Sequence, residues 1–335
     1  MQKKLLAVAS VLAIGNVTSA LACNGSHVLG GATAGAVYTI SAETMEKGGL
    51  YLGVNLETVQ NKNLSDARII RALQSGSTHL HSIDAVNSYS LSLSYGITDN
   101  LTLNTQLPYS SRKSVRAGEA EDGEFEVHPH GDVEDIGDFS AILQYKVYDK
   151  DEVKIALLGG FKAPTGRDDL KDGDEVIEAD LQPGSGSWDL FAGAAITKDF
   201  DNYSLHSDIL YKYNNEGVDD SQLGDIFTYN AAFSYKLIEH DHNDMLHELD
   251  EEEEFGYSVN VFLELNGEYV KEDEFAGVSA ENTGHSVVFA TTGIELIGDE
   301  GYSLFASISK PIYQDFNGVQ NEIDYKASFG IGKSF

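Results

Sequence analysis

Residues 89–95 read Tyr-Ser-Leu-Ser-Leu-Ser-Tyr, a strict alternation of apolar and polar side chains. The alternation resumes at 101–107, Leu-Thr-Leu-Asn-Thr-Gln-Leu, and again at 139–147. Successive side chains of a strand point to opposite faces, so each stretch predicts a strand with one apolar and one polar face. No helical period competes with this pattern after residue 49.

Twelve such stretches are present, and their connections alternate in length. Short turns, such as 99–100 and 299–300, occupy one side. Long polar loops span 61–83, 111–133, 164–185, 214–224 and 268–283. The predicted strands are 50–60, 84–97, 100–110, 134–148, 152–163, 186–199, 202–213, 225–238, 255–267, 284–297, 301–313 and 321–335.

An even number of such strands, with short turns on one side and long loops on the other, is typical of an outer-membrane β-barrel. A bilayer requires closure because every backbone polar group must be paired. The alternative is a soluble β-sandwich, but the polar faces here are too polar to pack into a dry core. We therefore predict an all-β, transmembrane antiparallel barrel of about 12 strands in a Gram-negative outer membrane, with both termini periplasmic.

The composition excludes several classes of protein. The chain has 335 residues, with 22 Lys and Arg against 54 Asp and Glu, and a formal net charge of −32. Such an acidic surface repels phosphates, so we expect no nucleic-acid partner. One Cys allows neither an intrachain disulfide nor a cysteine metal site. After residue 22, no apolar run reaches the roughly 20 residues of a membrane-spanning helix.

The first 22 residues have the features of a secretory signal peptide: two early lysines, an apolar run over 5–14 and a small-residue cleavage site at 20–22. We expect export, then a segment over 23–48 and the barrel over 49–335. The segment has no charge before Glu43, which fits either a periplasmic tail or a plug inside the barrel. Ala20 stands three positions before Cys23, where lipid-attachment signals usually have Leu, so ordinary cleavage is favoured over lipidation.

A set of ordered motifs resembles one barrel family. They are Thr-Ile-Ser-Ala-Glu-Thr-Met-Glu-Lys-Gly at 39–48, Tyr-Gly-Ile-Thr-Asp-Asn-Leu-Thr-Leu at 95–103 with Leu-Pro-Tyr at 107–109, Asp-Ile-Gly-Asp at 135–138, Lys-Ala-Pro-Thr-Gly-Arg at 162–167, Gly-Ser-Gly-Ser-Trp-Asp at 184–189 and Pro-Ile-Tyr-Gln-Asp-Phe-Asn-Gly at 311–318. Together they resemble the outer-membrane family labelled "putative MetA-pathway of phenol degradation", whose members are often called transporters. The resemblance implies a barrel and passive transport.

Projecting alternate residues inward predicts a lumen of mixed charge. The lysines and acids nearly balance, so the acidic excess lies in the loops. Such a lumen favours small polar solutes over large apolar ones, although the same ion pairs also suit a braced and closed pore. The predicted lumen residues are Lys146, Lys154, Lys162, Lys212, Lys236 and Lys326, with Asp189, Asp208, Glu264, Glu295, Asp324 and His206.

Ser204, His206 and Asp208 share one strand face, which suggests a hydrolase. Same-face neighbours two apart are roughly 7 Å apart, too far for direct contact between a nucleophile and its base. The sequence also has no Gly-x-Ser-x-Gly motif. We therefore expect no enzymatic activity and assign no catalytic residue.

Histidines cluster near carboxylates in several connections. His-x-His pairs occur at 79–81 and 128–130, and a His-rich segment at 239–254 is long for a turn that parity places in the periplasm. Imidazoles beside carboxylates suit Zn or Cu, so a divalent metal is the cofactor that these loops suggest. The alternative is a solvated acidic loop with incidental histidines. The candidate ligands are His128, His130, His240, His242 and His247.

These features predict an outer-membrane channel or transporter for small solutes, with divalent-metal traffic as its more specific form. The alternative is a non-conducting structural or surface-interaction barrel whose acidic loops bind cations or a partner. Expected partners are outer-membrane lipid, small solutes or metal ions, and the barrel-assembly machinery. The machinery would read the alternating last strand, which ends in Phe335.

Overall fold

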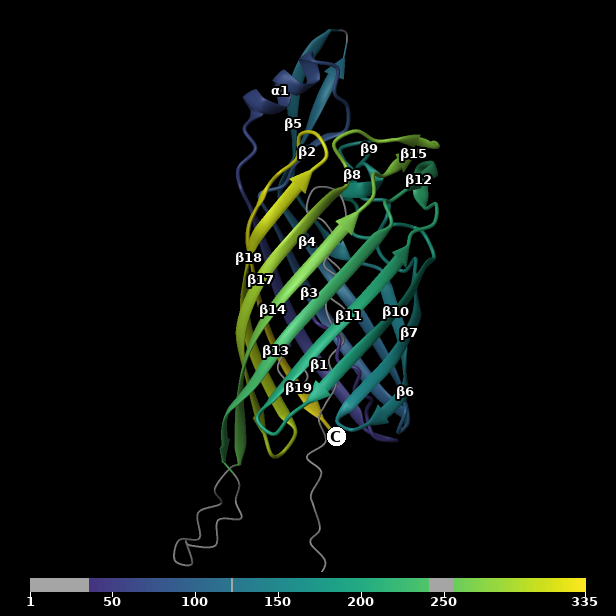
Figure 1. Cartoon of the computed structure of the whole chain (residues 1–335). Coiled ribbons are helices and arrows are strands. Elements are labelled where there is room, and N and C mark those ends of the chain that lie inside the picture. The colour runs from purple at the N-terminus through teal and green to yellow at the C-terminus, as the bar shows by residue number, and fades with distance from the viewer. Residues whose placement is uncertain (1–35, 122, 241–255) are drawn as a thin grey trace, which may run out of the picture.

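The computed structural model describes residues 36–121, 123–240 and 256–335, which form a closed antiparallel barrel (Figure 1). β1 pairs with both β19 and β3, and the pairing of β4 with β6 completes the ring. The twelve wall strands are β1 (Leu50–Asn61), β3 (Ala85–Thr98), β4 (Leu101–Glu121), β6 (Phe139–Lys150), β7 (Val153–Ala163), β10 (Asp189–Asp199), β11 (Tyr203–Tyr213), β13 (Ile226–His240), β14 (Tyr257–Val270), β17 (His285–Gly298), β18 (Tyr302–Phe316) and β19 (Ile323–Ser334).

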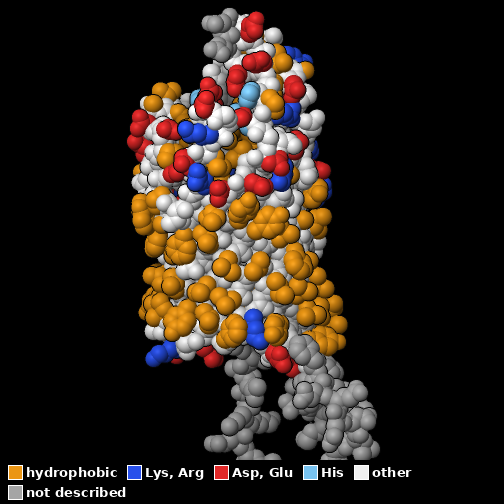
Figure 2. Space-filling view, turned by 180° about the vertical axis from the view of Figure 1, so that it is seen from behind, with side chains coloured by type: hydrophobic (Ala, Val, Ile, Leu, Met, Phe, Trp, Pro, Cys, Tyr) orange, Lys and Arg blue, Asp and Glu red, His pale blue; other side chains and the backbone are white. Residues whose placement is uncertain are grey.

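The alternation in the sequence becomes an apolar outside and a polar inside. On β3 the serines Ser90 and Ser92 are buried inside the barrel, whereas Leu91 between them is 55% exposed on the outer surface. Figure 2 shows the result, a belt of apolar side chains around the barrel with charged groups gathered beyond it. This surface is matched to lipid, and the predicted transmembrane barrel is confirmed.

The main correction to the predicted elements concerns residues 111–133, which we expected to form a loop. Instead, β4 continues to Glu121 and pairs with β5 (Glu124–Ile136) as a long hairpin. Most side chains of β5 are exposed whichever way they point. Val127 of this hairpin packs against the apolar cluster of Ile69 and Leu73, and Val115 and Val133 are buried in a second cluster. Most of the other side chains of β5 meet water rather than lipid, so the strict alternation that marks a wall strand is absent.

The remaining short elements gather at one end of the barrel, which we call the outer end (Figure 1). At the opposite, periplasmic end lie the short turns and Phe335, whose backbone N–H donates to the Leu50 carbonyl at 2.8 Å. No helix among the described residues is long and apolar enough to cross a membrane. The outer elements are α1 (Asp66–Gln74), β2 (Leu80–Ser82), β8 (Lys171–Asp172), β9 (Glu175–Val176), η1 (Ala179–Leu181), η2 (Val218–Asp220), β12 (Ser221–Gln222), β15 (Glu274–Phe275) and β16 (Val278–Ser279).

The interior of the barrel is filled by residues from outside the wall. One buried apolar cluster joins Ile40 and Ala42 to wall residues such as Phe191. A second joins Ile177 and Leu181 to wall residues of other strands. The predicted signal peptide and residues 23–35 lie outside the described residues, whereas residues 36–48 lie within them.

Candidate functional site

Residues 36–46, here called the lumen segment, lie inside the barrel rather than on its surface. All are buried except Thr44, which is half-buried, and Glu46, which is exposed. The segment enters at the periplasmic end, where the Gly48 N–H donates to the Gly96 carbonyl at 2.8 Å. It therefore occupies the path that a solute would take through the periplasmic half of the barrel.

Two predicted lumen acids hold the middle of this segment. The Glu264 carboxylate on β14 accepts hydrogen bonds from the backbone N–H groups of Val37 at 2.6 Å and Thr39 at 2.9 Å, and from the Thr39 hydroxyl at 2.7 Å. Asp208 on β11 accepts one from the Ile40 N–H at 2.7 Å. Donors of this kind compensate a buried carboxylate for lost water and fix the segment at the same time.

Small wall residues make room for the segment beside these acids. Asp208 pairs across the ladder with Ala195, and Glu264 pairs with Ala232. Both alanines are buried inside the barrel. A larger residue at either position would fill the space that the lumen segment takes, so the wall sequence and the segment are complementary.

The periplasmic part of the segment is held by different groups. Lys154 on β7 contacts Glu43 at 2.9 Å and Asp199 at 2.6 Å. The Gln144 side-chain amide on β6 donates to the carbonyls of Ser41 at 2.8 Å and Glu43 at 2.7 Å. Every one of these contacts is a hydrogen bond or ion pair, the kind of contact that water or a polar solute can replace.

A second element closes the outer half of the barrel. Residues 164–185, here called the capping loop, carry β8, β9 and η1. Ile177 and Leu181 of this loop are buried among wall residues such as Val86 and Val287. The Gln182 side-chain amide accepts a hydrogen bond from the Leu170 N–H and donates one to the Leu170 carbonyl, both at 3.0 Å, and so fixes the shape of the loop. The loop therefore inserts apolar side chains into the mouth.

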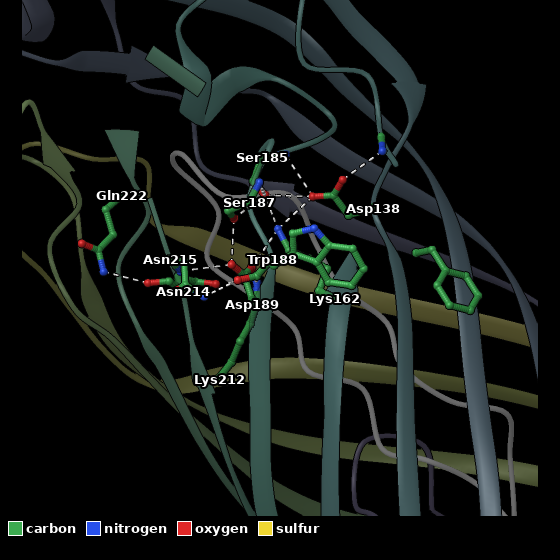
Figure 3. Close-up of polar contacts among 12 residues, drawn as sticks. Asp138, Lys162, Ser185, Ser187, Trp188, Asp189, Lys212, Asn214, Asn215 and Gln222 are labelled. Carbon is green, nitrogen blue, oxygen red and sulfur yellow. Dashed lines mark hydrogen bonds and ion pairs between the residues drawn. The ribbon is translucent and has the colours of Figure 1, made fainter. Parts of the chain in front are cut away.

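The capping loop ends in a buried network of charges (Figure 3). Lys162 on β7 lies 2.8 Å from Asp138 and 2.8 Å from Asp189, and Lys212 on β11 lies 3.4 Å from Asp189. The four side chains are at most 2% exposed. Two cations and two anions balance, which is the condition for burying them together.

Ser185 and Ser187 of the motif at 184–189 complete this network. Asp138 accepts hydrogen bonds from the Ser185 N–H and hydroxyl, both at 2.9 Å, and the Ser185 hydroxyl also contacts Lys162. Ser187 donates to Asp189 at 2.7 Å (Figure 3). Sequence reasoning missed Ser185 because it lies in a predicted connection, where inward and outward faces cannot be assigned by alternation. Asp138 and Ser187 lie within the predicted strands 134–148 and 186–199 and were not selected there, although in the structure both stand just before β6 and β10. Their motifs, 135–138 and 184–189, were the available signal.

Glycines in these motifs let three chain segments meet. A Cβ placed on Gly184 would lie 2.6 Å from the Gly166 carbonyl carbon, and one on Gly166 would lie 2.7 Å from the Gly137 carbonyl carbon. No larger residue fits without moving the backbone. Three of the motifs that resemble the barrel family, those at 135–138, 162–167 and 184–189, thus come together at one place.

The other predicted lumen residues are distributed along the wall. His206 contacts the Thr197 hydroxyl at 3.0 Å, Glu295 accepts from Asn260 at 3.0 Å, and Lys326 lies 4.0 Å from the centre of the Phe289 ring. Lys146, Lys236 and Asp324 lie at the ends of the barrel and pair with Asp149, Glu239 and Lys310.

The residues that suggested a hydrolase have separate partners. Ser204 donates to Asp199 at 3.0 Å, His206 contacts Thr197, and Asp208 binds the lumen segment. The arrangement therefore gives these three residues structural contacts with the wall and the segment.

The predicted metal ligands fall into two groups. His128 and His130 lie on β5 at the outer end, and both contact Asp172 of the capping loop. His242 and His247 lie outside the described residues, and His240 ends β13 without a described side chain. Only the first group can therefore be placed in the structure.

A histidine clamp also holds the capping loop. His81 on β2, whose side chain is 1% exposed, contacts Glu178 through Nε2 at 2.8 Å and Asp180 through Nδ1 at 3.1 Å. When both nitrogens carry a proton, the imidazolium forms an ion pair with each carboxylate. Burial opposes ionisation of Glu178, but the charge on His81 and the contacts from His79 and His81 outweigh it and lower the pKa of the Glu178 carboxyl.

Comparisons with known proteins agree with this architecture. Residues 104–244 match the family described as "Putative MetA-pathway of phenol degradation". The family resemblance is confirmed for this part of the chain. No curated relative matches the sequence.

Among solved structures, the chain is similar to an outer membrane channel from Pseudomonas putida F1. The two are 14% identical, the match covers 88% of this chain and 98% of that one, and the TM-score is 0.55. The NanC porin is 6% identical with a TM-score of 0.41, over 85% of this chain and 98% of that one. The CymD monoaromatic hydrocarbon channel is 10% identical with a TM-score of 0.39, over 87% and 89%. The last two scores are too low to bear on this chain, and the first shows the fold. The protein is an outer-membrane β-barrel.

Proposed function

We propose that this barrel is an outer-membrane channel for small polar solutes, closed from the periplasmic side by the lumen segment and from the outer side by the capping loop. One observation carries the proposal. The polar inner wall, besides bonding within itself, holds a separate stretch of chain through hydrogen bonds and ion pairs. A wall built this way becomes a polar passage when the segment leaves.

The chemistry of the wall indicates the class of solute. Inward residues include Asn230, Asn266 and Thr291, which offer both donors and acceptors without net charge. Groups of this kind can replace part of the hydration shell of a neutral or weakly charged polar solute. The label of the matched family names phenol degradation, which makes small aromatic compounds with a polar group useful probes.

Divalent-metal traffic is the more specific form of the proposal. Its support is the His-rich sequence at 239–254, with three imidazoles and several carboxylates near the periplasmic end. Calorimetry on the folded barrel, with His240, His242 and His247 intact or changed to Ala, tests it. Equal binding of Zn²⁺ by both proteins removes metal from the proposed function.

The barrel also implies partners. The apolar belt contacts lipid, and Phe335, which directly follows β19, is 68% exposed. We propose that the assembly machinery recognises this strand. Exchange of Phe335 for Ser should lower the amount of folded protein in the outer membrane, and unchanged assembly would contradict this role.

A planar-bilayer recording tests the channel directly. The purified, heat-modifiable barrel should give discrete current steps, which become longer when the segment is weakened. Small aromatics with a hydroxyl should reduce the current while they pass. If well-folded protein gives no current under any condition that releases the segment, the result would favour the non-conducting structural barrel.

A further inference from the structure

The outer end of the barrel carries a second cluster of chemically active side chains, distinct from the lumen. His128 and His130 on β5 and Asp172 on β8 are far apart in sequence, yet their ligand atoms all lie within 4.8 Å of one another. His128 Nε2 is 3.1 Å and His130 Nδ1 is 2.9 Å from the same oxygen, Asp172 Oδ2. Two imidazole nitrogens and one carboxylate oxygen, all possible metal ligands, thus lie close together.

Local backbone structure aims the two imidazoles. His128 and His130 are two apart on a strand, which favours one face. The ladder with β4 shifts register here, because Val115 pairs with Gly131 while Arg116 pairs with Pro129. Gly131 has a φ of +77°. The register shift and the positive φ form a bulge that leaves His130 unpaired in the ladder, a device that re-aims side chains.

The third group is equally well placed. Asp172 pairs with Glu175 in the short hairpin of β8 and β9, and Gly173 turns this hairpin with a φ of +61°.

The distances match those around a metal ion. Zn²⁺ binds imidazole nitrogen and carboxylate oxygen at about 2.0 to 2.2 Å, so neighbouring ligands are about 2.9 to 3.5 Å apart for angles between 90° and 109°. The two nitrogen–oxygen distances lie in or at the edge of that range before any ion enters. The His128 and Asp172 side chains are 46% and 37% exposed, which leaves an entry path and room for water as a further ligand.

We infer that His128, His130 and Asp172 form a binding site for a divalent ion of the zinc or copper class. Two imidazoles and one carboxylate suit these ions better than Ca²⁺ or Mg²⁺, which prefer all-oxygen sites. The ligands come from two elements, the β4–β5 hairpin and the capping loop. A bound ion therefore fastens the capping loop to the hairpin and adds to the clamp at His81. This inference does not depend on the proposed channel function.

The neighbouring cluster of His81, Glu178 and Asp180 differs from the proposed metal site in its exposure and in the placement of its carboxylates. Both nitrogens of His81 already face a carboxylate, one on each side of the ring, and the side chain is 1% exposed. His128 and His130 instead share a single acceptor oxygen in an accessible place, which is the arrangement that an ion improves.

Calorimetric titration with ZnCl₂, in excess Ca²⁺ to occupy carboxylate-only positions, tests the site. The full chain is used in a background with His240, His242 and His247 changed to Ala and Cys23 to Ser, which removes the His-rich segment and the thiol. This protein should bind one Zn²⁺ per chain at the outer site. Both Asp172→Asn and the double change His128→Ala with His130→Ala should weaken binding by at least about tenfold, since even groups that only orient ligands have effects of this size.

Asp174→Asn is the matched control, because Asp174 is an exposed carboxylate on the same hairpin. It should bind Zn²⁺ like the background protein, and heat-modifiable migration shows that each variant is folded. Equal binding in the background and Asp172→Asn proteins overturns the inference. So does a loss of the same size in Asp174→Asn, which indicates diffuse acidic binding, or no stoichiometric binding in the background protein.

Discussion

Replacing Glu264 by Gln should release the lumen segment and open the barrel. The carboxylate now accepts from Val37 at 2.6 Å, from the Thr39 N–H at 2.9 Å and from the Thr39 hydroxyl at 2.7 Å. Glutamine keeps the size of the side chain, but one of its two terminal groups becomes a donor and faces backbone N–H groups. At least one hydrogen bond to a charged acceptor is therefore lost.

The magnitude follows from that single loss. A hydrogen bond to a charged group contributes about 1.5 to 3 kcal/mol, so the ratio of undocked to docked segment should rise roughly 10- to 150-fold. In planar bilayers the fraction of time in the conducting state should rise by a comparable factor while it is small. Single-channel amplitude should not change, because the wall is unaltered.

Glu295→Gln is the matched control for this experiment. Glu295 is also buried in the barrel, but it accepts from Asn260 of the wall at 3.0 Å. This variant should gate like the native protein. Equal open fractions in the native and Glu264→Gln proteins, or the same increase in both variants, would refute the role of Glu264 in holding the segment.

Further predictions address the charge network, the clamp and the periplasmic ion pair. Asp189→Asn leaves two buried lysines without their shared anion, so the free energy of unfolding measured in denaturant should fall by about 3 to 5 kcal/mol. A decrease of less than about 1 kcal/mol would contradict a stabilising role for the charge network. The contact with Glu178 raises the pKa of His79, and partial burial of His79 only partly opposes this. The ion pair of His79 with Glu178 therefore stabilises the capping loop fully below about pH 6.5, and this stabilisation is lost as the pH rises through the raised pKa. The depressed pKa of Glu178 gives stability that is present above about pH 4.3 and lost on acidification. Protease cleavage of the loop should thus be slowest between these values, and a flat profile excludes the clamp. Lys154→Glu should shift ion selectivity toward cations, and an unchanged reversal potential places the path elsewhere.

The strands could be predicted from the sequence because lipid and lumen impose opposite demands on alternate residues. The β4–β5 hairpin could not, since neither of its faces meets lipid. Lys162, Asp189 and Lys212 lie on strands and could be placed by parity, whereas Ser185 lies in a connection. The contact of His128 and His130 with Asp172 depends on how the capping loop folds over the outer opening of the barrel. No local sequence pattern encodes the path of that loop. The absence of charge before Glu43 allowed a plug, but only the positions of Asp208 and Glu264 show where the segment binds.

A reversible disulfide between the lumen segment and the wall tests whether this segment closes the channel. The Ser41 and Thr197 hydroxyl oxygens are 3.2 Å apart, so cysteines at both positions, with Cys23 changed to Ser, are placed to form a bond. The oxidised barrel should carry no current, and reduction on the bilayer should restore discrete conductance steps. The same steady current in both states, or no current in either, would contradict a channel closed by this segment.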